Sequence, residues 1–143
     1  DPFGAVGMIK VFVDSNYVID YLRGRDYTKP LIEKVSSKQI EAYISAATLF
    51  ELYVGALLSG NPEKKFEDIE TLLAWVQVVD IDKEIMRIAA KVHVNLRKKG
   101  SMIELQDILI AASSIALGMP LLTNNKKHFE RIEDLEVKSW EEY

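Results

Sequence analysis

Three carboxylic acids and one amide stand where strands end or helices begin. Asp14 directly follows a short apolar run, Glu51 lies in a helical segment after the second such run, and Asp107 opens a strongly apolar helical segment. Asn125 follows a later short run. Carboxylates gathered at one place repel one another, so a cation is expected among them, and Mg²⁺ or Mn²⁺ prefers such oxygen ligands. A bound Mg²⁺ activates water and holds phosphate oxygens, which indicates phosphodiester hydrolysis.

The spacing of apolar residues predicts how these four side chains are brought together. We expect strands at 9–13, 40–45, 76–79 and 121–123, with an edge strand at Val137, and helices that include 47–58, 85–96 and 108–117. Alternating strands and helices predict an α/β fold with a mainly parallel sheet that is covered on both faces. Ligands bind at the carboxyl ends of the strands in such sheets. The four candidate residues are therefore expected at one edge.

Each carboxylate also has a purely structural interpretation. Asp14 suits the N-cap of the helix that follows it, and Asp107 suits the N-cap of 108–117. Thr48 and Glu51 have the spacing of a capping box, in which the glutamate bonds back to the threonine amide. Taken singly, each residue is a weak signal, and their joint placement at one edge favours the functional interpretation.

Two further residues lie near the expected site. Glu104 precedes Asp107 by three positions and is a less favoured candidate for the cluster. His128 follows two lysines, and a catalytic histidine is chemically reasonable near neutral pH. A surface or phosphate-contacting role is the more usual one for such a residue.

The amino-acid composition limits the classes of protein to which the chain can belong. The length of 143 residues suits a single domain, which we expect to span residues 8–143. We expect residues 1–7 to be a cloning remnant and Met8 to be the native start. The absence of cysteine excludes disulfides and thiolate metal sites and fits a cytoplasmic location. No apolar stretch reaches the roughly 18–20 residues of a membrane span. A net charge of −4 argues mildly against phosphate binding, although lysines and arginines cluster at 97–99 and 126–131.

Four segments of the chain resemble the PIN-domain family, and within it the VapC-type toxin ribonucleases of toxin–antitoxin pairs. The segments are VFVDSN at 11–16, SAATLFELYVG at 45–55, IELQDILIAA at 103–112 and LLTNNKKHFERI at 121–132. They occur in the family's order and span nearly the whole chain from Met8. The third and fourth together are the most specific.

The resemblance implies an α/β/α sandwich with about five strands and a Mg²⁺- or Mn²⁺-dependent endoribonuclease. Asp14, Glu51 and Asp107 fall on the family's acidic positions, and Thr123 falls on a hydroxyl position common among relatives. Asn125 replaces a fourth acid, which puts a second metal in doubt because an amide carries no charge. The resemblance further implies an RNA substrate, a homodimer and inhibition by a cognate antitoxin.

Other functions fit the residues less well. A haloacid-dehalogenase-type phosphatase requires Asp-x-Asp after its first strand, whereas this chain has Asp14-Ser15-Asn16. A response-regulator receiver domain requires an acidic pair there, and no glycine-rich phosphate loop is present. A non-catalytic RNA- or protein-binding module stays open because of Asn125. Such a module would bind RNA without any metal.

Overall fold

The central feature of the fold is a parallel five-stranded sheet with the strand order β3-β2-β1-β4-β5. The computed structural model describes residues 8–143, so the expected remnant at 1–7 lies outside the described residues. The strands are β1 (Ile9–Val13), β2 (Ile40–Ser45), β3 (Val76–Val79), β4 (Leu121–Leu122) and β5 (Val137–Lys138). The predicted α/β class and the parallel sheet of about five strands are confirmed.

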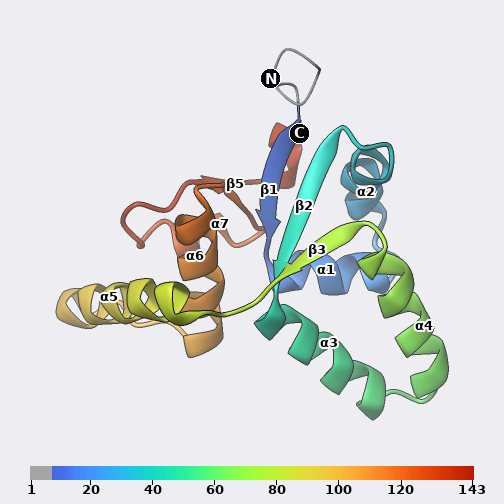
Figure 1. Cartoon of the computed structure of the whole chain (residues 1–143), viewed down its shortest axis with the longest axis horizontal. Coiled ribbons are helices and arrows are strands. Elements are labelled where there is room, and N and C mark those ends of the chain that lie inside the picture. Colours follow the sequence, from blue (N-terminus) through green and yellow to red (C-terminus); the bar gives the residue numbers. More distant parts are fainter. Residues whose placement is uncertain (1–7) are drawn as a thin grey trace.

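Helices cover both faces of the sheet (Figure 1). One side carries α1 (Ser15–Leu22), α2 (Lys29–Ser36), α3 (Ala46–Leu58) and α4 (Pro62–Leu73), and the other carries α5 (Lys83–Lys99), α6 (Leu105–Leu117) and α7 (Lys126–Phe129). Two short 3-10 helices span Asp26–Thr28 and Trp140–Glu142. No helix within 8–143 is long and apolar enough to cross a membrane.

The alternation of side chains along the strands divides the core into two halves. Val11 and Val13 of β1 contribute to the core under α1–α4, whereas Phe12 between them contributes to the core under α5 and α6. In β4, Leu122 and Leu121 divide in the same way. Burial on both faces explains why residues 11–13 and 121–122 are continuous apolar runs in the sequence.

The helix ends place the acidic residues at the carboxyl edge of the sheet. In Figure 1, β1 and β2 run toward the lower part of the view, where α1 and α3 begin.

Glycines end two helices as expected, since Gly100 after α5 and Gly118 after α6 both adopt left-handed backbone conformations, with φ of 67° and 65°. Helix α6 begins three residues earlier than predicted.

The capping-box interpretation of Glu51 is wrong. Helix α3 begins at Ala46, and its N-cap is Ser45, whose side chain accepts a hydrogen bond from the Ala47 amide at 3.0 Å. Glu51 therefore lies in the second turn, beyond the reach of any capping contact. Thr48 faces the interior and is fully buried.

Candidate active site

Asp14 is a buried carboxylate at the junction of β1 and α1. It occupies the N-cap position of α1, yet its side chain makes no capping hydrogen bond. Its carboxylate instead accepts a hydrogen bond of 2.8 Å from the hydroxyl of Thr123, and only 2% of Asp14 is exposed. Burial raises the pKa of Asp14 above its ordinary value, against the opposing effect of the Thr123 hydrogen bond.

The pairing of β1 with β4 creates this contact. Val13 lies opposite Leu122, and the Asp14 amide donates to the Leu122 carbonyl at 2.9 Å, so the residues after the two strands become neighbours. Asp14 and Thr123 are 109 positions apart in the chain. Thr123 is fully buried, and its hydroxyl also accepts the backbone amide of Asn125 at 3.0 Å.

Asp107 brings a second carboxylate to the same edge from the first turn of α6. Its charge is among the causes that raise the pKa of Asp14, so the two groups repel each other. The carboxylate Oδ2 of Asp107 lies 3.0 Å from the ring Nε2 of His128 in α7. His128 therefore contacts a candidate site residue and is only partly exposed. Its nearness in sequence to Asn125 was the only signal for this placement.

Glu51 supplies the third carboxylate from α3. Burial is the main cause that raises its pKa, and the charges of Asp107, Asp14 and Glu104 raise it further. A hydrogen bond from the Ser15 side chain lowers the same pKa. The three predicted carboxylates are therefore electrostatic neighbours, and Glu104 at the N-cap of α6 adds a fourth negative charge at the rim.

Sequence analysis did not identify the role of Ser15. This buried hydroxyl follows Asp14 directly and lies 2.8 Å from the hydroxyl of Thr48 in α3. Thr48 and Glu51 are one turn apart, so Ser15 joins the start of α1 to the helix that carries Glu51. A serine directly after a candidate metal ligand was the available signal.

Asn125 lies at the start of α7 and is exposed, and its side chain does not cap that helix. Its neighbour Asn124 is tied to the rest of the fold, because its amide donates to the Tyr27 hydroxyl, which in turn donates to Asp20. The segment after β4 is therefore anchored on both sides of Asn125, by Asn124 and by the short helix α7.

The donor chemistry of the cluster fits a divalent cation. All three carboxylates offer hard oxygen ligands, and the raised pKa values of Asp14 and Glu51 reflect, beside burial, a mutual repulsion that a cation would relieve. Among residues 8–143, no group of three or more acidic or histidine side chains is already placed to hold a metal ion. The Oδ2 atom of Asp107 contacts His128, and the Oδ2 atom of Asp14 accepts the hydrogen bond from Thr123.

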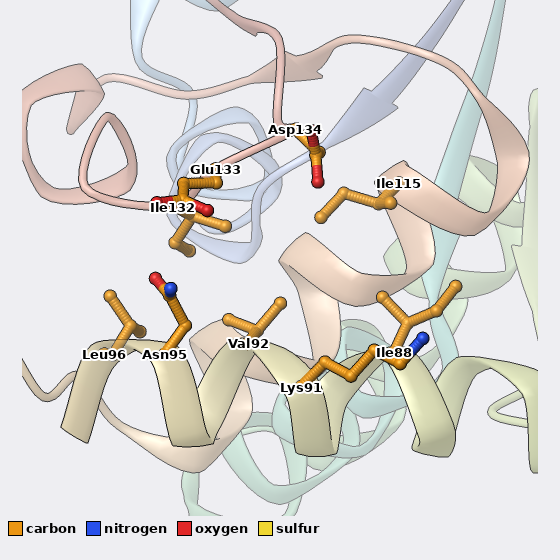
Figure 2. A pocket seen from close by; sticks show the side chains of 9 residues that line it. All are labelled: Ile88, Lys91, Val92, Asn95, Leu96, Ile115, Ile132, Glu133 and Asp134. Carbon is orange, nitrogen blue, oxygen red and sulfur yellow. The ribbon is translucent and has the colours of Figure 1, made fainter. Parts of the chain in front are cut away.

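Two cavities differ in their relation to the carboxylates. A cavity of about 330 Å³ lies between α5, α6 and the turn at 132–134, and Figure 2 shows Asn95 of α5 directed toward that turn. None of the candidate site residues lines it. A second cavity, of about 290 Å³, lies between α1, α3 and α4, and Glu51 forms part of its wall. Of these two cavities, the second shares a residue, Glu51, with the candidate site.

A parallel α/β sheet with acidic side chains gathered at its carboxyl edge is compatible with a nuclease domain. The PIN domain family model matches residues 11–135. Ribonuclease VapC2 from Haemophilus influenzae is 29% identical over 133 residues, covering 93% of this chain and 99% of the relative. The tRNA(fMet)-specific endonuclease VapC from Salmonella typhimurium is 27% identical, with the same two coverages.

The solved structures agree with the sequence comparisons. VapBC-1 from nontypeable Haemophilus influenzae superimposes with a TM-score of 0.82 and 31% identity, over 93% of this chain and 99% of that one. The chain belongs to the PIN-domain family. The predicted resemblance to VapC ribonucleases and the predicted enzyme class, a ribonuclease, are confirmed by these relatives.

Proposed function

We propose that this chain is a Mg²⁺- or Mn²⁺-dependent endoribonuclease and the toxin of a toxin–antitoxin pair. The observation that carries the proposal is the buried Asp14 beside Asp107 and Glu51 at the carboxyl edge of the sheet, where burial and mutual repulsion raise the pKa of Asp14. The names of the ribonuclease relatives support the reaction, and the VapBC structures support an antitoxin partner.

The proposed roles follow from the contacts. Asp14, Glu51 and Asp107 would hold the cation, which when bound activates water and stabilises charge on a phosphate oxygen. Thr123 holds the Asp14 carboxylate in place through its 2.8 Å hydrogen bond. Asn125 places an amide, not a fourth charge, at the exposed start of α7.

We further propose that the protein is a homodimer formed through α3. Four apolar residues of this helix are exposed at the spacing of one helical face: Phe50, Val54, Leu57 and Leu58, with exposed fractions of 68%, 39%, 64% and 83%. Such a stripe on a soluble domain usually marks an interaction surface. A second copy meets it with the same stripe around a twofold axis, which makes the surface self-complementary. A cytoplasmic location remains a prediction.

Cleavage of an end-labelled, mixed-sequence RNA tests the reaction. Wild type, Asp107→Asn and Asp26→Asn are each incubated with EDTA, Mg²⁺ or Mn²⁺. Asp26 is the matched control because its carboxylate is exposed and pairs only with Lys29 at 3.0 Å among the described ion pairs. We expect metal-dependent cutting by wild type and Asp26→Asn and none by Asp107→Asn. RNA binding without metal and without cutting would favour the binding-module alternative.

A further inference from the structure

The cavity that shares Glu51 with the carboxylate site has two chemically distinct parts. Its apolar wall comes from three helices and includes Leu22 of α1, Leu52 of α3 and Ile69 of α4. Its polar rim includes Arg23, at the end of α1, and Lys65 of α4. We call this cavity of about 290 Å³ the α3 pocket.

The charges around the α3 pocket leave two cations available to a ligand. Asp68 also lines the pocket, but its carboxylate is paired with Lys64 at 2.9 Å. Neither Arg23 nor Lys65 forms an ion pair within residues 8–143. Glu51 places a carboxylate in the same lining, so a negatively charged group is favoured only beside Arg23 and Lys65.

We propose that the α3 pocket binds one nucleotide of the RNA substrate, adjacent to the phosphate that is cleaved. The apolar wall suits the face of a nucleobase, and Arg23 and Lys65 suit the phosphate attached to that nucleotide. Because Glu51 belongs to both the pocket and the carboxylate site, an RNA strand that crosses the site passes next to the pocket. This inference rests on the proposed ribonuclease function.

The cavity in Figure 2 does not fit the same ligand. Its charged lining residues are Lys91, Glu133 and Asp134, so it offers a phosphate one cation, whereas the α3 pocket offers two. The Figure 2 cavity shares no residue with the carboxylate cluster. The α3 pocket is therefore the better site for a nucleotide that is covalently attached to the reacting phosphate.

Gly55 offers a way to fill the pocket without disturbing α3. It lines the pocket on a regular helix, and a Cβ added there meets no other atom within 4 Å. Alanine at this position improves helix propensity and adds one methyl group. Leucine keeps the favourable propensity and places a larger side chain at the wall of the pocket. Gly55→Ala is thus the matched control for Gly55→Leu.

The experiment measures binding of a fluorescein-labelled, mixed-sequence oligoribonucleotide in EDTA, and KM and kcat for RNA cleavage with Mg²⁺. We expect Gly55→Leu to weaken binding and raise KM by about tenfold, the effect of losing the contact of one nucleotide with the apolar wall. We expect kcat to stay within about twofold, because the carboxylates are unchanged. Gly55→Ala, with a smaller side chain, should weaken binding and raise KM less than Gly55→Leu does, and thermal melting verifies that both variants are folded.

Substitutions of the rim provide an independent test. Arg23→Gln and Lys65→Gln should each weaken RNA binding severalfold and reduce the dependence of affinity on salt by about one unit of slope. The control is Lys98→Gln, an exposed cation at the end of α5 and outside the pocket. This control should bind RNA as wild type does.

Unchanged RNA affinity and KM in Gly55→Leu would overturn the proposal. Loss of inhibition by the antitoxin in that variant, with RNA binding unchanged, would assign the pocket to the protein partner and overturn it as well. Failure of the ribonuclease proposal has a different signature. In that case wild type cuts no RNA with any metal, while Gly55→Leu still loses RNA affinity relative to Gly55→Ala.

Discussion

The hydrogen bond between Thr123 and Asp14 makes a quantitative prediction about stability. Thr123→Val replaces a buried hydroxyl by a methyl group of similar shape, so no cavity forms. The substitution removes a 2.8 Å bond to a buried carboxylate and a 3.0 Å bond from the Asn125 amide. A hydrogen bond to a charged group contributes about 1.5–3 kcal/mol. The Asn125 bond adds about 0.5–1 kcal/mol, because water replaces it at this exposed residue.

We therefore expect Thr123→Val to lower the free energy of unfolding by about 2–4 kcal/mol at neutral pH without metal. For a chain of this size, that loss corresponds to a fall of about 5–12 °C in melting temperature. Thr123→Ser is the matched control, since it keeps the hydroxyl and loses one buried methyl group at a cost of about 1 kcal/mol. Urea titration followed by circular dichroism in EDTA measures both variants.

The dependence on pH tests the cause of this destabilisation. Burial raises the pKa of Asp14 in the folded protein, so ionised Asp14 lowers wild-type stability above its unfolded-state pKa. That loss is recovered as the pH falls through the folded-state pKa. Thr123→Val removes a pKa-lowering bond and raises the folded-state pKa further. The difference between variant and wild type is therefore full at pH values above both folded-state pKa values and shrinks in acid, where Asp14 is protonated in both proteins.

Two results would refute this reasoning. A valine variant as stable as the serine variant at neutral pH would mean that the hydrogen bond contributes little to stability. A stability loss that stays constant from neutral to acidic pH would mean that the Asp14 charge is not its cause. A double-mutant cycle with Asp14→Asn separates the pair from effects elsewhere, and we expect the loss caused by Thr123→Val to be smaller when Asp14→Asn is already present.

Three other outcomes are expected. Asp14→Asn and Asp107→Asn should each abolish RNA cleavage yet raise the melting temperature in EDTA, because each removes repulsion from the cluster; a lowered melting temperature would contradict this. Millimolar Mg²⁺ or Mn²⁺ should stabilise wild type, by about 2.7 kcal/mol at 100 times the dissociation constant, and should not stabilise Asp14→Asn in differential scanning fluorimetry. Leu58→Glu should shift a dimer to monomer in light scattering, whereas Met86→Glu on the exposed face of α5 should not; a persistent dimer would exclude the α3 stripe.

The secondary structure was largely readable because its signals are local. The β-branched run at β1, the alternation in β2 and the glycines after α5 and α6 act within a few residues, and all were predicted within three positions. The acidic residues could be assigned to one edge because parallel strands share an orientation. Thr48 was misinterpreted as a cap because two hydroxyls, Ser45 and Thr48, stand close together at the start of the helix, and sequence spacing does not tell which one caps it.

The contacts within the site were decided by strand order and helix placement. The adjacency of β1 and β4 brings Thr123 to Asp14 across 109 positions, and no local pattern contains that pairing. The proximity of His128 to Asp107 and of Ser15 to Thr48 also arises between separate helices. Residue types and periodicity thus determined which side chains reach the carboxyl edge. Only the tertiary structure decided which of them touch, because those distances depend on how two cores on opposite faces position helices against one sheet.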